Sequence, residues 1–542
     1  MEERKVQTGR SKKGMVSTAS PAATAAGAEM LAAGGNAVDA AVAAAFCLGV
    51  SEPQASGIGG QSMGLIHLPD EDRSFALDGS ARAPFELSPQ KNPDTPMKLG
   101  LRAAAVPSTP AALGYLLEQY GSLPLEDILA PSIRACEEGV PVTPLMHRLI
   151  HKEVDQLKKD PLASVRFLHK KKALQPGDML FQPELAETFK RMAEAGWRDF
   201  YTGEIAEDIV EDMKKRKGLI TDIDLGQIPL PVERDVLESS YRGYDVVTYP
   251  PPGAGRVLVQ LLKTMEQFDP DELQNDTPTG AVLLALAFRF ALNYRQRMPM
   301  DPDHFSQSMN QVMIDETYAA ETAGRIRDIF NAALEDTFVP PPTAGETTHL
   351  SVVDENGMAV GITQSIELVF GSKRMAAERG FFYNNYMSAF EYKDRTHPYY
   401  LLPGGRPWSS VAPVMLFKKG RLHYLLGSPG SSRISTTLAQ VITRLIDQDE
   451  SLEEAIAAPR FHSSDSGDLQ IEQPRFPREV TDALRLASFQ LQKRDAYSFY
   501  LGCVQGVEAP GRWFGRFTGA ADPRRDGTAS GPDELDEGSA SE

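Results

Sequence analysis

The sequence predicts a layered α/β fold in which helices enclose two β-sheets. Three observations lead to this prediction: a mainly helical stretch from about Thr109 to Glu335, strand-like sequence on both sides of it, and a proline-rich connector directly after it. Helices and sheets each have to bury an apolar face, and stacking them in layers does so. The chain has 542 residues and 42% hydrophobic residues, as is ordinary for a globular protein with a substantial core.

The N-terminal part begins with Ala-rich sequence. From about Ala23 to Val50 the apolar residues recur every three or four positions and are interrupted at Gly34 and Gly35, which predicts two helices joined by a glycine turn. SGIGGQSMGLIHL (56–68) predicts a glycine turn that leads into a strand, and SFALDGSARAPFEL (74–87) predicts strand, turn and strand. The GIGG turn lacks the features of a dinucleotide site, so we expect it to serve close backbone packing.

The character of the sequence changes at the connector EDTFVPPPTAGETTH (335–349). After it, five runs predict strands: HLSVVD (349–354), MAVGITQSI (358–366), GFFYNN (380–385), SSVAPVMLFKKG (409–420) and LHYLLGS (422–428). RISTTLAQVITRLID (433–447) predicts a helix. The small and acidic residues from about Gly527 to Glu542 predict a disordered tail.

Charge and composition exclude several classes of function. The chain has 56 Lys and Arg against 74 Asp and Glu, a net charge of −18, whereas nucleic acids and anionic membranes are bound by basic faces. The nine His and three Cys show no metal-ligand spacing, so neither a metal nor a cofactor is expected. The N-terminus has no apolar signal region and the chain no apolar run of about 18 residues, so we expect a cytoplasmic protein without a membrane span.

The sequence GETTHLSVVD places a threonine, Thr347, where the connector meets a strand. The Thr347 hydroxyl at such a junction can attack the carbonyl of Glu346, and hydrolysis of the resulting ester leaves Thr347 with a free α-amine. This amine has a pKa of about 8 and can accept the hydroxyl proton, so one residue supplies nucleophile and base. By itself, however, TTH after a loop is also typical of the ordinary start of a β-strand.

The chain resembles the gamma-glutamyltransferase family, whose small subunit starts with the threonine nucleophile. The run TTHLSVVDENGMAVGITQSIELVFG carries this resemblance. Further motifs of the family occur before and after it, in the family's order: SGIGGQSM (56–63), AVPSTPAAL (105–113), LAPSIRACEEGVPV (129–142), FYTGEIAEDIV (200–210), YRGYDVVTYPPPGAGRVLVQLL (241–262), FFYNNYMSAF (381–390), RPWSSVAPVM (406–415), GSPGSSRIST (427–436) and GAADPRRDG (519–527). The resemblance implies an αββα N-terminal nucleophile hydrolase sandwich. It also implies self-cleavage into a large segment, 1–346, and a small segment, 347–542, which stay paired as one αββα unit.

The resemblance also implies catalytic roles. Thr347 is the nucleophile, and Ser365 occupies the position of a hydroxyl that hydrogen-bonds it. Thr363 lies two residues away on the same strand face and is the reserve choice. Gly430 and Ser431 match the glycine pair whose backbone N–H groups form the oxyanion hole. The second glycine is serine here, which preserves the hole provided that Ser431 avoids a glycine-only conformation.

The carboxylate pocket implied by the resemblance contains Ser409 and Ser410, which match the serine pair that holds the substrate's α-carboxylate. This pocket also needs an arginine. The position of the family arginine holds Ser80, and Arg82 follows two residues later. On a strand, Ser80 and Arg82 would share one face, so we expect Arg82 to supply the guanidinium.

The ammonium pocket departs from the family pattern. Ala389 replaces the family's aspartate, and Tyr386 corresponds to the neighbouring polar contact. Glu367 stands where the family has asparagine. We hypothesise that Glu367 supplies the anion that Ala389 cannot, so that the α-ammonium of a substrate still has a partner.

The function that the resemblance implies is that of a self-processing amidohydrolase or acyltransferase. It would cleave or transfer a γ-glutamyl group from glutathione-like donors through an ester on Thr347, with water or the amine of an amino acid or peptide as acceptor. One alternative keeps this machinery but changes the acyl group, as in glutaryl-type cephalosporin acylases or enzymes acting on poly-γ-glutamate. Another, of a different class, is an uncleaved and inactive scaffold.

Overall fold

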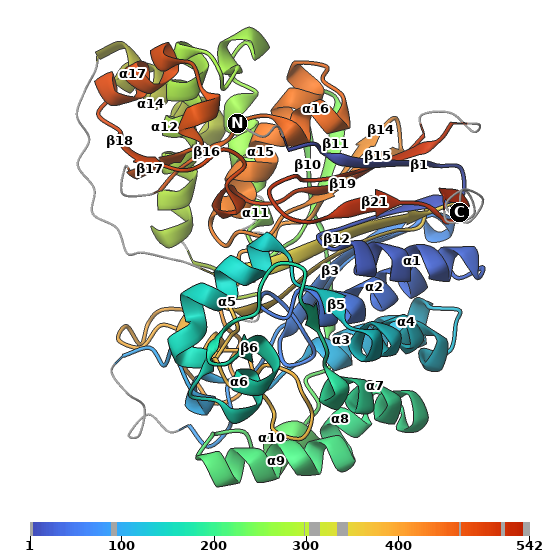
Figure 1. Cartoon of the computed structure of the whole chain (residues 1–542). Helices are drawn as coiled ribbons and strands as arrows, with labels where there is room; N and C mark the ends of the chain where they lie inside the picture. The colour runs from blue at the N-terminus through green and yellow to red at the C-terminus, as the bar shows by residue number, and fades with distance from the viewer. Residues whose placement is uncertain are drawn as a thin grey trace.

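Two seven-stranded sheets lie face to face, and helices cover the outer face of each (Figure 1). The computed structural model describes residues 4–87, 95–297, 299–302, 315–332, 345–464, 468–510 and 515–534. Every strand pair within the two large sheets is antiparallel. The predicted layered α/β fold with two sheets between helices is therefore confirmed. Residues 335–344 of the predicted connector lie outside the described residues.

The strands of each sheet come from distant parts of the chain. In spatial order, the first sheet contains β1 (Gln7–Ser11), β20 (Phe517–Ala521), β19 (Gln505–Glu508), β15 (Arg421–Gly427), β14 (Val414–Lys418), β11 (Tyr244–Thr248) and β10 (Leu237–Tyr241). The second contains β21 (Thr528–Ser530), β2 (Gly14–Thr18), β12 (Glu346–Asp354), β13 (Ala359–Glu367), β3 (Gln61–Leu68), β4 (Arg73–Gly79) and β9 (Val232–Asp235). Both sheets therefore contain strands from before and from after the connector, so neither part of the chain completes a sheet by itself.

The helices form two layers, each with its own apolar core. On the side of the second sheet lie α1 (Pro21–Ala32), α2 (Ala37–Ser51), α3 (Thr109–Tyr120), α4 (Leu125–Glu138), α5 (Pro144–Leu157), α6 (Pro161–Phe167), α7 (Pro183–Ala195), α8 (Asp199–Thr202), α9 (Glu204–Arg216) and α10 (Asp222–Gly226) (Figure 1). On the side of the first sheet lie α11 (Gly255–Met265), α12 (Pro278–Arg297), α14 (Glu316–Ala332), α15 (Arg433–Asp447), α16 (Leu452–Ala457) and α17 (Arg478–Leu486). A thinner apolar layer lies between the two sheets.

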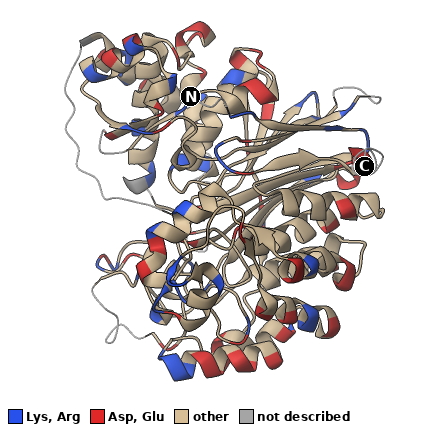
Figure 2. Ribbon diagram, in the orientation of Figure 1, with Lys and Arg blue, Asp and Glu red and all other residues tan. Residues whose placement is uncertain are grey.

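The remaining strands form small sheets outside the two large ones. They are β5 (Val140–Pro141) with β8 (Met179–Leu180), β6 (Leu168–His169) with β7 (Lys172–Ala173), and the three strands β16 (Phe461–Ser463), β17 (Asp468–Ile471) and β18 (Gln490–Lys493). Lys, Arg, Asp and Glu lie mostly on the outer helices and loops, with both signs mixed on the visible face (Figure 2). None of the helices in the described ranges is both long and apolar enough to span a bilayer.

Strand β12 lies inside the second sheet, between β2 and β13. Its side chains alternate as expected for a strand between two packed layers. Leu350 and Val352 face the helices, whereas Val353 enters the apolar layer between the sheets. Ser351 lies on that second face too, because its hydroxyl donates to the backbone oxygen of Gln505 in the opposite sheet at 3.0 Å. Thr347 is the second residue of this interior strand.

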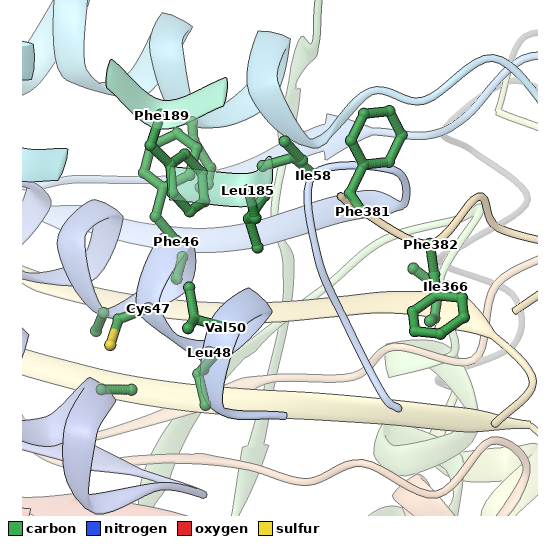
Figure 3. Close-up of a cluster of buried hydrophobic side chains, with 14 of the residues drawn as sticks. Phe46, Cys47, Leu48, Val50, Ile58, Leu185, Phe189, Ile366, Phe381 and Phe382 are labelled. Carbon is green, nitrogen blue, oxygen red and sulfur yellow. The ribbon is translucent and has the colours of Figure 1, made fainter. Parts of the chain in front are cut away.

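Helix α2 supports β12 and β13 from behind, and all of its residues are buried. Asn36 and Asp39 form a capping box at its start, which satisfies the free N–H groups of the first turn. Figure 3 shows the apolar cluster next to this helix, where Phe46 of α2 lies against Phe189 of α7. Ile366 of β13 lies beside Phe382 in the same cluster. Apolar packing thus fixes the strand segment that carries Ser365.

The GIGG turn serves close backbone packing, as predicted. A Cβ atom at Gly60 would lie 2.2 Å from the backbone oxygen of Ser365, and one at Gly59 would lie 2.1 Å from that of Phe382. Both distances are impossible for a side chain, so only glycine permits this contact. The turn brings the large segment directly against the backbone of Ser365.

Two local predictions were wrong, and two strands were missed. GFFYNN (380–385) forms no strand, because the side-chain amide of Asn384 instead donates to the backbone oxygens of Gly59 and Ala105. The second strand predicted within 74–87 is reduced to one bridge between Arg82 and Val106. The strands β1 and β2 were not predicted.

The prediction of a disordered tail from Gly527 was wrong for residues 527–534. Thr528–Ser530 form β21, which pairs with β2. The acidic side chains that suggested disorder accept hydrogen bonds from backbone N–H groups: Asp533 from Lys12 at 3.1 Å and Glu534 from Arg10 at 2.8 Å. These carboxylates therefore accept hydrogen bonds from the end of the edge strand β1 and from the residues directly after it. Residues 535–542 lie outside the described residues.

Candidate active site

Thr347 lies at the start of β12 with 7% of its surface exposed. Its hydroxyl forms no hydrogen bond with any residue that the structure describes. The pairing of β12 with β13 is irregular here, because Glu346 lies opposite Glu367 while Thr348 lies opposite Gln364. Such a bulge sets two residues of one strand against one residue of the other. Here Ser365 and Ile366 of β13 lie opposite Thr347 alone, and the buried Thr347 hydroxyl makes no hydrogen bond to the described residues.

Ser365 contacts the carbonyl group that precedes Thr347. Its hydroxyl donates to the backbone oxygen of Glu346 at 2.5 Å and accepts from the backbone N–H of Glu367 at 2.8 Å. The distance between the Ser365 hydroxyl oxygen and the Glu346 carbonyl oxygen is at the short end of the range for hydrogen bonds donated by a hydroxyl. A donor in this position stabilises negative charge on the Glu346 oxygen. Ser365 therefore lies at the peptide bond before Thr347, but its hydroxyl bonds the Glu346 carbonyl and, among the described residues, makes no hydrogen bond to the Thr347 hydroxyl that the resemblance implied.

Thr363, the reserve choice for this role, lies elsewhere on the same strand face. Its hydroxyl is 2.8 Å from Nδ1 of His349, and Nε2 of His349 is 3.1 Å from the Ser351 hydroxyl. Burial lowers the pKa of His349 to about 3, so the imidazole is neutral at physiological pH. Strand register explains the difference, because Thr363 lies directly opposite His349. The geometry thus favours Ser365 over Thr363 as the residue that acts at Thr347.

The residues on either side of Thr347 are tied to a buried ion pair that was not predicted. Nη2 of Arg525 donates to the Glu346 carboxylate at 3.2 Å, and Nη1 donates to Glu52 at 3.1 Å. The Thr348 hydroxyl donates to Glu52 at 2.6 Å. Burial raises the pKa of both Glu52 and Glu346, and the guanidinium of Arg525 opposes this shift. No local sequence pattern announces such a contact, since Glu52 and Arg525 are separated by 473 positions.

Gly430 and Ser431 lie just before helix α15 and next to the junction. A Cβ atom at Gly345 would lie 3.3 Å from Cβ of Ser431, so the two segments are in contact. Gly430 has φ +131, which L-residues rarely adopt, whereas Ser431 has φ +54 in the left-handed region that serine can reach. Their backbone N–H groups donate to no residue in the described part of the chain. The condition that Ser431 avoids a glycine-only conformation is met.

Arg433 was not predicted and lies directly behind this turn. It is buried, its guanidinium stacks 4.1 Å from the ring centre of Tyr500, and its Nε has no hydrogen-bond partner among the described residues. Burial lowers its pKa, while Tyr500 and Glu346 counteract the shift. The positive charge of Arg433 therefore lies close enough to Glu346 to act on the junction.

Ser409 and Ser410 are held by an arginine that was not predicted. Arg295 of α12 donates from Nη1 to the Ser410 hydroxyl at 3.1 Å and from Nη2 to the Ser409 backbone oxygen at 2.5 Å. Its guanidinium lies 4.7 Å from the ring centre of Trp408. Burial lowers the pKa of Arg295 to about 10, and no carboxylate in the described ranges forms an ion pair with it. No sequence signal marked this role, because α12 also contains Arg289 and Arg297.

Arg82 lies on the segment that runs beside the loop of the serine pair. The neighbouring residue Ala83 exchanges backbone hydrogen bonds with Gly404 and Gly405 at 2.9 Å each. Ser80 does not share its surroundings, because the Ser80 hydroxyl donates to Asp78 at 2.5 Å. Arg82 is thus placed near the loop that leads to Ser409, and its role in a carboxylate pocket stays a prediction.

The predicted ammonium pocket contains an unpaired carboxylate. Glu367 is half-buried, ends β13 with φ +80, and has no ion-pair partner among the described residues. Burial raises its pKa to about 7. Burial and Glu367 also raise the pKa of Tyr386, whose phenol contacts Ser365 and Gln61. Ala389, by contrast, packs against an apolar cluster.

No group of three or more His, Cys, Asp or Glu side chains in the described ranges is arranged to hold a metal ion. The groups that surround the junction are hydroxyls, backbone N–H groups and charged side chains. They converge on the carbonyl of Glu346 and the hydroxyl of Thr347, as acyl transfer requires.

Comparison with known proteins identifies the family. The chain matches the family described as gamma-glutamyltranspeptidase over residues 23–532. The glutathione hydrolase proenzyme of Escherichia coli (strain K12) is 34% identical over 538 residues, which cover 95% of this chain and 91% of that protein. The Acylase ACY 1 proenzyme of Pseudomonas sp. (strain SE83) is 33% identical over 533 residues, 95% of this chain and 93% of that protein.

A solved structure agrees with these similarities. The crystal structure of cephalosporin acylase from Bacillus halodurans superposes with a TM-score of 0.87 at 28% identity and covers 96% of both chains. The αββα N-terminal nucleophile hydrolase sandwich that the sequence resemblance implied is therefore confirmed. This chain belongs to the gamma-glutamyltranspeptidase family of enzymes, which includes relatives named as acylases.

Proposed function

We propose that this enzyme cuts its own chain between Glu346 and Thr347 and then uses Thr347 to cleave or transfer a γ-glutamyl group. One observation carries the proposal: the Ser365 hydroxyl donates to the carbonyl oxygen of Glu346, while the adjacent Thr347 hydroxyl makes no hydrogen bond to any described residue. The relatives named as proenzymes support a chain that is activated by cleavage.

Self-cleavage proceeds by attack of the Thr347 hydroxyl on the Glu346 carbonyl carbon. A C–O bond forms, the peptide C–N bond breaks, and the hydroxyl proton passes to the departing nitrogen. Water then hydrolyses the ester, leaving a carboxylate on Glu346 and a free amine on Thr347. Ser365 stabilises the negative charge on the oxygen during the first step, and the N–H groups of Gly430 and Ser431 are additional donors near the junction.

Turnover repeats this chemistry with an external amide. The neutral α-amine of Thr347 takes the hydroxyl proton as the oxygen attacks the acyl carbonyl, and the same proton passes to the leaving amine. Water or the amine of an amino acid or peptide then resolves the ester. His349 is excluded as the base, because its buried ring has a pKa of about 3 and is bonded to Thr363 and Ser351.

Recognition of the γ-glutamyl group rests on two oppositely charged regions. Ser409 and Ser410, supported by Arg295 and Arg82, receive the α-carboxylate. Glu367 receives the α-ammonium. The absence of an ion-pair partner for Glu367 among the described residues supports this assignment, since a buried carboxylate without a cation is unfavourable until a substrate supplies one.

A second candidate is an acylase that removes glutaryl groups, which have the same carbon chain but no ammonium. Two observations favour it: the apolar surroundings of Ala389, and the similarity to proteins named as acylases. Initial rates with γ-glutamyl and glutaryl p-nitroanilides separate the two. A higher kcat/KM for the γ-glutamyl compound supports the first function, and a higher value for the glutaryl compound rejects it in favour of the second.

A further inference from the structure

Four side chains form a continuous chain of hydrogen bonds that starts and ends on the neighbours of Thr347. Glu346 is bonded to Arg525, Arg525 to Glu52, and Glu52 to Thr348. We call these four residues the flanking clamp. One end of the clamp lies on the acyl side of the Glu346–Thr347 peptide bond, and the other lies on the amine side.

The clamp is buried and contains two carboxylates but one guanidinium. The side chains of Arg525 and Glu52 are 4% and 6% exposed, and that of Glu346 is 13% exposed. Two carboxylates share one guanidinium, and its positive charge opposes the rise in pKa that burial causes in both. Arg524 precedes Arg525 in the turn between β20 and β21, but it forms ion pairs with Glu472 and Asp522 and not with the junction. Arg525 alone of this arginine pair is directed to the junction.

The elements that supply the clamp are fixed independently. Glu52 is the C-terminal cap of the buried helix α2, and Arg525 lies in the turn between β20 and β21. Helix α2 packs on the outer face of the second sheet, and β20 and β21 belong to the two sheets themselves. The clamp therefore ties the junction to rigid parts of the fold on both sides, whereas Thr347 between them makes no side-chain hydrogen bond to the described residues.

We propose that the flanking clamp positions the peptide bond for self-cleavage, with Arg525 holding the acyl side and Glu52 holding the amine side. The inference rests on the proposed function. Holding both neighbours leaves rotation of the Thr347 side chain as the main motion needed for attack, and restriction of this kind accelerates intramolecular reactions. Arg525 and Glu52 exchange no proton and form no bond with the reacting atoms, so they are positioning residues.

The test follows self-cleavage over time during cell-free synthesis, with the products separated on denaturing gels. The single variants are Glu346→Ala, Arg525→Gln, Arg525→Lys and Thr348→Val, which keeps the shape of threonine but lacks its hydroxyl. Charge-assisted hydrogen bonds of this kind correspond to roughly tenfold to hundredfold in rate. We expect Glu346→Ala, Arg525→Gln and Thr348→Val to slow cleavage by about tenfold or more, and Arg525→Lys to restore part of the rate.

A double variant distinguishes positioning from general destabilisation. If the Glu346–Arg525 contact matters as such, the combined Glu346→Ala and Arg525→Gln variant cleaves no more slowly than Arg525→Gln alone. Arg216→Gln is the matched control, because Arg216 of α9 also binds two buried carboxylates, Asp160 and Asp212, and contacts no residue of the clamp. We expect this control to cleave at the wild-type rate.

Three outcomes overturn the clamp: wild-type cleavage by both Arg525→Gln and Thr348→Val, multiplication of the two single effects in the double variant, or equal slowing by Arg216→Gln. Melting temperatures of the Thr348→Val and Arg525→Lys variants show that these proteins are folded. If the wild-type chain itself does not cleave, the proposed function fails. If it cleaves and the clamp variants do so equally fast, only the clamp is refuted.

Discussion

The Ser365→Ala variant tests how the structure prepares the Glu346–Thr347 bond for attack. The change removes a hydroxyl that lies 2.5 Å from the Glu346 carbonyl oxygen. Loss of one donor to a developing oxyanion costs roughly 3 to 4 kcal/mol in comparable sites, which corresponds to a rate roughly a hundred to a thousand times lower. The backbone N–H groups of Gly430 and Ser431 remain, so we expect the rate of self-cleavage to fall by roughly a hundredfold, the smaller of these two effects.

The assay is the time course of self-cleavage during cell-free synthesis. Ser365→Thr retains the hydroxyl and is the matched control, for which we expect cleavage close to that of the wild type. Ser365→Ala also leaves the Glu367 N–H without its acceptor, which destabilises the fold by about 1 to 3 kcal/mol and lowers the melting temperature. Cleavage of Ser365→Ala at the wild-type rate, with the protein folded, would refute the role of this hydroxyl.

Three further predictions concern the acyl pocket and the turn before α15. Because burial raises the pKa of Glu367 to about 7, its carboxyl is neutral below that pH and anionic above it, so the ratio of γ-glutamyl to glutaryl turnover should rise between about pH 6 and about pH 8. The Glu367→Gln variant should lose this rise; an unchanged pH profile would exclude Glu367 as the ammonium partner. Arg295→Gln should raise KM for both anilides roughly tenfold with a smaller effect on kcat, and Arg295→Lys should recover part of the loss. Ser431→Gly should increase the free energy of unfolding by about 1 kcal/mol or less, because glycine adopts φ +54 without strain; chemical denaturation measures this, and a decrease would contradict it.

The alternation of β12 and β13 could be predicted because it is a local pattern. Strands between two packed layers need apolar or satisfied side chains on both faces, and HLSVVD and MAVGITQSI have this composition. Their pairing then follows from the short turn between them, and it places Ser365 near the start of β12. The spatial relation of Thr347 to Ser365 was thus accessible from the sequence, with the family resemblance supplying the roles.

The strands β1, β2 and β21 were not predicted because their stability comes from distant partners. QTGRS and GMVST carry little strand signal, and β1 pairs with β20 some 500 positions later in the chain. The acidic residues after β21 looked like a solvated tail, yet Asp533 and Glu534 cap backbone N–H groups near the N-terminus. Composition alone cannot reveal a carboxylate whose partner lies at the other end of the chain.

The charged residues around the site escaped prediction for the same reason. Tertiary packing buries three arginines at the site: Arg295 beside the serine pair, Arg433 beside the turn of Gly430 and Ser431, and Arg525 beside Glu346. The burial of an arginine is a property of the tertiary fold and leaves no local pattern in the sequence. The cytoplasmic location and the identity of the acceptor stay predictions.

The intact mass of the purified protein tests the central claim most directly. Wild-type chain should separate into two fragments that meet between Glu346 and Thr347, with threonine as the first residue of the smaller one. The Thr347→Ala variant should remain a single chain and lack amidase activity. A wild-type chain that stays whole, or a Thr347→Ala variant that still splits at this bond, would contradict the account.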